Sequence, residues 1–131
     1  MQAAPDPREL PVRVLIADDE PLFVDSVSAL LSNDERVKVV GTASNGQDAV
    51  DLASALVPDV TLMDISMPVL DGIEAARRIR LACPNASVLI LTGSSIAADV
   101  DRARQAGVAG FLTKDRIGTQ LLSAILEAAD R

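Results

Sequence analysis

Short apolar runs alternate along the chain with segments in which apolar residues recur at helical spacing. Each run is almost continuously hydrophobic, as is typical of a strand buried on both faces of a sheet. The five predicted strands are Val12–Ala17, Val37–Ala43, Val60–Asp64, Ser87–Thr92 and Val108–Thr113. The five predicted helices are Pro21–Ser32, Gly46–Leu56, Asp71–Ala82, Ser95–Ala106 and Thr119–Ala129. The fourth helix has the weakest apolar face.

Strand–helix units in series predict an α/β fold, in which helices cover both faces of a parallel sheet. Short connections and right-handed crossovers favour a flavodoxin-like (βα)5 three-layer fold with the five-stranded order 2-1-3-4-5. Such a sheet binds its ligand at the carboxyl ends of its strands, where the strand order reverses. We expect one domain over residues 12–131. Residues 1–11, which hold three prolines and several charged residues, are expected to be a disordered lead-in.

Composition excludes several classes of function. The chain has no histidine, so a Ser-His-Asp triad and a histidine-ligated metal site are impossible. Its net charge is −7 and no basic cluster is visible, so we expect no direct binding of nucleic acid by this chain. No apolar run is long enough to cross a bilayer, so no membrane association is expected. The single cysteine, Cys83, cannot form an internal disulfide and favours a cytoplasmic location.

Polar residues of complementary chemistry stand at four of the predicted strand ends. Asp18 and Asp19 follow the first strand, Asp64 ends the third, Thr92 ends the fourth, and Lys114 follows the fifth. Crowded carboxylates repel one another, and a divalent cation with oxygen ligands, such as Mg²⁺, relieves this repulsion. A metal beside a carboxylate and a lysine can hold a phosphoryl group, and the carboxylate can serve as the nucleophile.

Each of these residues also has a purely structural interpretation. Asp19 or Glu20 before a proline is typical of a helix N-cap, and Asp71 of another. Lys114 beside Asp115 could be a solvated ion pair that contributes little. A single Asp or Thr at a strand end is equally ordinary. The coincidence of matching chemistry at four strand ends favours a functional site over these separate explanations.

Four segments, LIADDEP, TLMDISMPVLDGIEAARRIR, VLILTG and GVAGFLTKD, resemble the receiver domain of two-component response regulators, and most closely the NarL/FixJ family. The resemblance extends from Val12 to about Ala129. It implies that Asp64 is the phosphoacceptor, that Thr92 and Lys114 contact phosphoryl oxygens, and that Thr92 and Phe111 form the switch. It also implies four Mg²⁺ ligands, namely Asp18, Asp19, Asp64 and the backbone carbonyl of Ser66.

The same resemblance implies the partners. The expected phosphoryl donor is a sensor histidine kinase, and the expected consequence is a phosphorylation-dependent homodimer. Receivers of this type control transcription through a C-terminal helix-turn-helix domain, so we expect the natural protein to continue beyond Arg131 and to bind DNA only through that domain. The chain would be a regulatory phosphoacceptor that assists only its own phosphorylation and dephosphorylation.

Several alternatives stay open at this point. The chain could be a free-standing receiver, or a receiver-like interaction module that is never phosphorylated, although it keeps every acidic and lysine position. An aspartate-nucleophile phosphatase would need a second acid two residues after Asp64, where Ser66 stands. A flavin or nucleotide site would need a glycine-rich phosphate loop, and the segment 41–46 is too poor in glycine.

Overall fold

The computed structural model describes residues 10–93 and 97–129. Five parallel strands form one sheet in the order β2-β1-β3-β4-β5, which confirms the predicted topology. The strands are β1 (Val12–Ala17), β2 (Val37–Ala43), β3 (Val60–Asp64), β4 (Ser87–Thr92) and β5 (Gly110–Thr113). The order reverses between β1 and β3, so the carboxyl ends of these two strands lie side by side.

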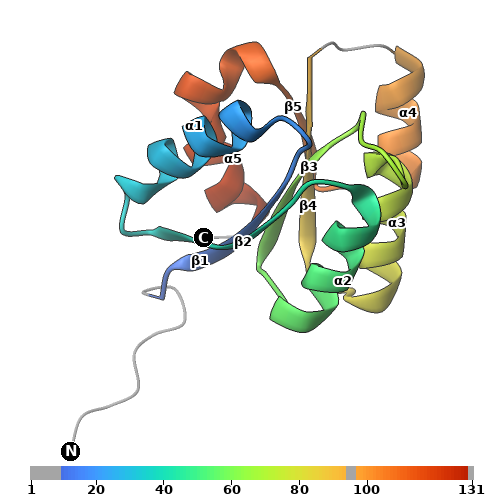
Figure 1. Cartoon of the computed structure of the whole chain (residues 1–131), viewed down its shortest axis with the longest axis horizontal. Coiled ribbons are helices and arrows are strands. Elements are labelled where there is room, and N and C mark those ends of the chain that lie inside the picture. Colours follow the sequence, from blue (N-terminus) through green and yellow to red (C-terminus); the bar gives the residue numbers. More distant parts are fainter. Residues whose placement is uncertain (1–9, 94–96, 130–131) are drawn as a thin grey trace, which may run out of the picture.

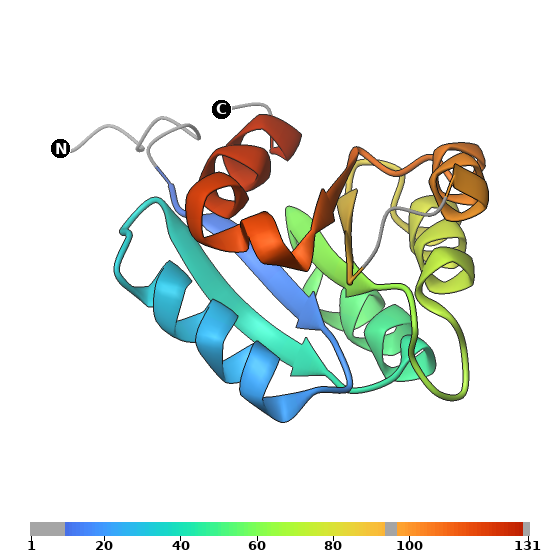
Figure 2. The same ribbon diagram turned by 90° about the horizontal axis from the view of Figure 1, so that it is seen from above.

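Helices cover both faces of the sheet, as Figures 1 and 2 show. Two helices contribute residues to the core on one face and three to the core on the other, which gives the three layers that the sequence predicts. On the first face lie α1 (Pro21–Ser32) and α5 (Ile117–Ala128). On the second face lie α2 (Gly46–Leu56), α3 (Gly72–Ala82) and α4 (Ala97–Gln105). None of the described helices is both long and apolar enough to cross a membrane.

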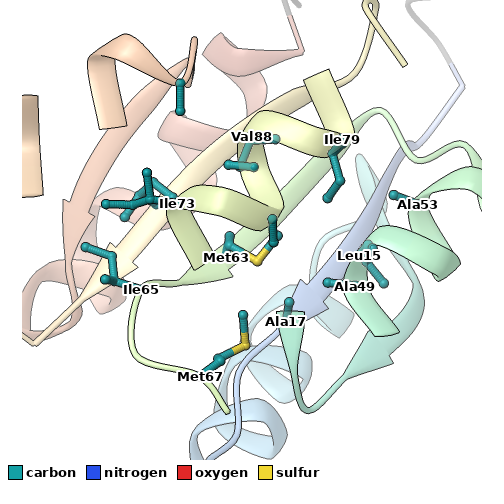
Figure 3. Packing of buried hydrophobic residues seen from close by; sticks show 14 of the residues in the cluster. Leu15, Ala17, Ala49, Ala53, Met63, Ile65, Met67, Ile73, Ile79 and Val88 are labelled. Carbon is teal, nitrogen blue, oxygen red and sulfur yellow. The ribbon is translucent and has the colours of Figure 1, made fainter. Parts of the chain in front are cut away.

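The core has two parts because side chains alternate across the sheet. Met63 packs with the α2 and α3 side chains Ala49 and Ile79 on one face (Figure 3). Leu62 packs on the other face against α1 and α5, beside Leu31 and other fully buried aliphatic residues. Almost all of this core is aliphatic, since the chain has only two phenylalanines and no other aromatic residue.

The helix that was predicted to begin at Asp71 begins one residue later. Asp71 is the N-cap of α3, and its Oδ1 accepts hydrogen bonds from the backbone N–H groups of Ile73 and Glu74. An N-cap has extended backbone angles, so α3 starts at Gly72. The capping interpretation of Asp71 is therefore confirmed.

The two last elements also differ from their predicted bounds. The strand that was predicted from Val108 begins at Gly110, because the Val108 N–H closes the end of α4 by donating to the Ala103 carbonyl at 3.3 Å. The helix that was predicted from Thr119 begins at Ile117. It follows directly on a 3-10 turn, η2 (Lys114–Arg116).

Two predictions fall partly outside the described residues. Of the predicted lead-in, residues 1–11, only Leu10 and Pro11 are described, so its disorder stays a prediction. The predicted helix Ser95–Ala106 is described from Ala97 to Gln105.

The backbone of Val57 should limit the stability of the domain. Val57 ends α2 in the left-handed conformation, with φ 47° and ψ 61°, and its side chain is largely exposed. A β-branched residue is costly there, whereas glycine is not. We expect Val57→Gly to raise the free energy of unfolding by about 0.5–1 kcal/mol in urea denaturation. Val57→Ala keeps the strained backbone, so it should raise the free energy of unfolding clearly less. An equal increase in the two variants would contradict the explanation.

Candidate functional site

Lys114 is the centre of the polar cluster at the carboxyl edge of the sheet. Its Nζ lies 2.8 Å from Oδ2 of Asp18 and 3.6 Å from Oδ1 of Asp64. Only 17% of its side chain is exposed. The ammonium thus reaches from the end of the edge strand β5 to the ends of β1 and β3. Three of the predicted site residues are brought together in this way, and the interpretation of Lys114 as a solvated partner of Asp115 is wrong.

Asp18 is an almost fully buried carboxylate that is held by one hydrogen bond and one ion pair. The residue is 2% exposed, and its Oδ1 accepts a hydrogen bond from the Glu20 backbone N–H at 2.9 Å. Its buried Oδ2 is paired with the Lys114 ammonium at 2.8 Å. The nearby carboxylates of Asp19 and Asp64 add further negative charge, so an additional cation is favoured at this position.

The donor set around Asp18 suits a hard divalent cation. One carboxylate oxygen each of Asp18, Asp19 and Glu20 lies within 4.8 Å of the others. Asp18 is buried, whereas the other two residues are exposed and open to solvent. Mg²⁺ takes one or two carboxylates and keeps several waters, so it fits such a half-open group of oxygens.

The charge on Asp64 is held in an unfavourable environment. Asp64 is 6% exposed. Burial is the main cause that raises the pKa of Asp64 to about 6, and the neighbouring carboxylate of Asp18 adds to it, while Lys114 opposes the rise. For Lys114, burial disfavours the charge, but the carboxylates of Asp18, Glu20 and Asp64 outweigh it and raise its pKa above the ordinary value.

Gly72 allows a close backbone contact with Asp64. A Cβ at Gly72 would overlap the Asp64 carbonyl oxygen, so only glycine allows the first turn of α3 to approach the end of β3 so closely. The Gly72 N–H also donates to the Ile65 carbonyl at 2.8 Å. Sequence reasoning named only the preceding Asp71, as a helix cap, and gave this glycine no role of its own. The glycine directly after the capping Asp71 was the available signal.

The loop between β3 and α3 contains a strained turn. The Leu70 N–H donates to the Pro68 carbonyl at 2.8 Å, which closes a γ-turn around Val69. Val69 has φ 71° and is largely exposed, an unfavourable position for a β-branched residue. Strained turns of this kind persist only where the surrounding structure enforces them. Here a Cβ at Gly46 would overlap the Leu70 carbonyl oxygen, so the first residue of α2 packs directly against the loop.

The remaining predicted residues lie around the cluster. Thr92 is buried at the end of β4, where it pairs in register with Thr113. Phe111 is half-buried on β5 and packs into the core on the α2, α3 and α4 side of the sheet. Alternation along β4 places Thr92 on that same face, because Val88 and Ile90 pack there. Ser66 is exposed in the loop that follows β3.

Two residues at the start of α1, its N-cap Glu20 and Phe23, also reach this site, and sequence reasoning missed their role. Glu20 occupies the N-cap position of α1, but its side chain makes no capping hydrogen bond. Instead its Oε1 lies 3.1 Å from the Lys114 Nζ. The centroid of the Phe23 ring is 4.2 Å from the same Nζ, a cation–π contact. No local pattern links these residues to Lys114, because the contacts arise only from the order of the strands.

Comparisons with known proteins agree with this geometry. The family profile "Response regulator receiver domain" matches residues 14–126. The probable transcriptional regulatory protein NarL of Mycobacterium tuberculosis is 40% identical over 124 residues, which cover 95% of this chain and 57% of that protein. The solved signal receiver domain of the putative response regulator NarL from the same organism superposes with a TM-score of 0.88 at 40% identity, and covers 92% of this chain and 97% of that one.

A second group of relatives carries a different activity in its name. Protein-glutamate methylesterase/protein-glutamine glutaminase 2 of Pseudomonas fluorescens is 44% identical over 106 residues, which cover 79% of this chain and 28% of that protein. The chain therefore spans little more than half of the NarL protein, and less than a third of this enzyme.

The raised pKa of Asp64 predicts a pH-dependent stability in metal-free buffer with a chelator. An unfolded aspartate has a pKa of about 3.9, so folding favours the protonated form and stability falls as the pH rises from about 4 to about 6. Asp64→Asn removes this cost. We expect it to stabilise the domain by up to about 3 kcal/mol at about pH 7, and by much less below about pH 4.

Urea denaturation across this pH range checks the prediction. Asp25→Asn, at an exposed carboxylate on α1, is the matched control and should change stability little at any pH. An Asp64→Asn effect of equal size at about pH 4 and about pH 7 would show that ionisation of Asp64 is not its cause.

Proposed function

The chain belongs to the response regulator receiver domain family, and from this we propose that it is a signalling switch in which Asp64 accepts a phosphoryl group. The contact that carries this proposal is the Lys114 ammonium, which lies 3.6 Å from the buried Asp64 carboxylate and 2.8 Å from Asp18. A buried carboxylate beside a fixed cation can receive a phosphoryl group, because the cation offsets the charge that arrives with it.

The proposed reaction is phosphoryl transfer from a phosphohistidine of a sensor histidine kinase. A carboxylate oxygen of Asp64 forms a bond to phosphorus while the phosphorus–nitrogen bond of the donor breaks, and the freed imidazole takes up a proton from solvent. With a pKa of about 6, Asp64 is mostly ionised near neutral pH and can act as the nucleophile. Lys114 and the Thr92 hydroxyl would each hold a phosphoryl oxygen.

Receiver domains bind Mg²⁺ at an acidic pocket, and this chain has an acidic cluster at the matching place. We propose that Asp18, Asp19, Asp64 and the backbone carbonyl of Ser66 would hold the ion. When bound, Mg²⁺ would supply charge neutralisation for the carboxylates and for the phosphoryl oxygens. The crowding of the Asp18, Asp19 and Asp64 carboxylates, whose repulsion contributes to the raised pKa of Asp64, supports this proposal.

The proposed output is control of transcription. A relative of 40% identity is named a transcriptional regulatory protein, although this chain covers only 57% of it. The net charge of −7 opposes DNA binding by this chain, so DNA would be bound by a C-terminal helix-turn-helix domain of a longer cytoplasmic protein. Residues 12–131 would be the receiver unit, and it would itself catalyse only its own phosphorylation and dephosphorylation. The methylesterase relative suggests an alternative output, namely an enzyme domain attached to the receiver.

Transmission of the signal is proposed to run through Thr92, Phe111 and α4. Thr92 and Phe111 lie on the same face of the sheet, on neighbouring strands. Among the described side chains of α4 only Ala103 is fully buried, so this helix is weakly anchored and can shift at low cost. Movement of Thr92 toward the phosphoryl group would leave space for Phe111 to turn inward. The changed surface would favour a homodimer.

Labelling with a small phosphodonor such as acetyl phosphate tests the phosphoacceptor. With Mg²⁺ present, we expect the parent chain to gain one phosphoryl group by mass spectrometry, Asp64→Asn to gain none, and Asp19→Ala to lose nearly all labelling because a metal ligand is gone. Asp25→Asn changes the charge of a nearby carboxylate and should be labelled like the parent. Parental labelling of Asp64→Asn, or of Asp19→Ala in a chelator, would contradict the proposal.

Hydrogen exchange with and without beryllofluoride, a phosphoryl mimic, tests the switch. We expect changed protection in α4 and β5 of the parent chain, and a much smaller change in Thr92→Ala even though it still binds the mimic. Thr113→Ala, at the residue paired with Thr92 on β5, is the matched control and should respond like the parent. A response confined to α1 and α2, with Thr92→Ala behaving as the parent, would rule out this route.

A further inference from the structure

Among the described residues, Lys114 contacts an uncharged ring as well as its charged partners. Its Nζ lies 4.2 Å from the centroid of the Phe23 ring. Phe23 stands on the first turns of α1, and its ring also packs against the core between the sheet, α1 and α5. The ring is therefore held by the fold, whereas the ammonium sits at the end of a flexible four-carbon stem that must be immobilised at an entropic cost.

The charged contacts of Lys114 are the ones that the proposed function would alter. Phosphorylation would convert the Asp64 carboxylate into an acyl phosphate, and a bound divalent cation would draw on the charge of Asp18. The side chain of Glu20 is 67% exposed, so its ion pair with Lys114 is screened by solvent and weak. The Phe23 ring carries no charge that titrates, binds metal or is modified. Among the contacts described, it is the one that stays the same throughout the cycle.

We propose that Phe23 is a positioning residue for Lys114, and that the face of its ring keeps the ammonium beside Asp64 when the charges of the site change. This inference rests on the proposed function, because it concerns the same site. A leucine at position 23 would fill much of the same core space but would lack the negative ring face that attracts the ammonium.

Phe23→Leu is the first test. We expect it to slow labelling of Asp64 by acetyl phosphate at saturating Mg²⁺ about fivefold, the size that one partly desolvated cation–π contact supports. The dissociation constant for Mg²⁺ should stay within about twofold, since the ring is not a metal ligand. A parental labelling rate in Phe23→Leu would overturn the proposal.

Fluorinated phenylalanines separate the ring electrostatics from packing. Mono-, di- and trifluorophenylalanine placed at position 23 keep the ring shape and progressively weaken its negative face, so the labelling rate should fall in steps. The same series at Leu81, an exposed position on α3 away from the site, is the matched control and should give no graded decline. A flat series at position 23, or an equal decline at both positions, would overturn the proposal.

An NMR measurement reads the contact without any labelling. Protons of the Lys114 side-chain end should be shifted upfield by the ring current of Phe23, and the shift should vanish in Phe23→Leu and decrease in steps along the fluorinated series. Absence of this shift in the parent chain would overturn the inference. If the parent chain shows the shift but is never phosphorylated, the proposed function fails, and the Phe23 contact stands as a structural one.

Discussion

The Lys114 ammonium lies between the carboxylates of two residues that are almost fully buried, Asp18 and Asp64, and the rest of the carboxyl edge is arranged around this contact. Burial of two acidic groups side by side is costly, and one lysine offsets only part of that cost. The raised pKa of Asp64 reflects the part of this cost that Lys114 does not offset. A site with this residual charge imbalance favours the arrival of further cations, and it is sensitive to any change in the charge of Asp64.

The surrounding backbone holds this imbalance in place. Gly72 allows α3 to press against the carbonyl of Asp64, and Gly46 allows α2 to press against Leu70. Between them the loop makes a γ-turn at Val69, which a β-branched residue adopts only under constraint. These close backbone contacts fix the position of the Asp64 main chain at the end of β3. Strain and unfavourable charge are thus concentrated at the same edge of the sheet.

Stability is distributed unevenly away from this edge. Large aliphatic side chains anchor α1, α3 and α5, whereas in the described part of α4 the buried contact is made by Ala103. A weakly anchored helix next to a charge-sensitive site can change position at low cost. In the sheet, β4 lies beside β3, which ends in Asp64, and β5 lies beside β4; α4 joins these two strands along the chain.

Sequence by itself determined the strand order, the bounds of most elements and the acidic and basic residues at the strand ends. These features follow from local periodicity and from the rule that parallel strands meet at one edge. Tertiary structure decided what Glu20 and Phe23 do, why position 72 is glycine, and where β5 begins. The physical reason is that such contacts join segments remote in sequence: a side chain on α1 meets Lys114 only once the sheet order and helix packing are set, and no spacing along the chain encodes that distance.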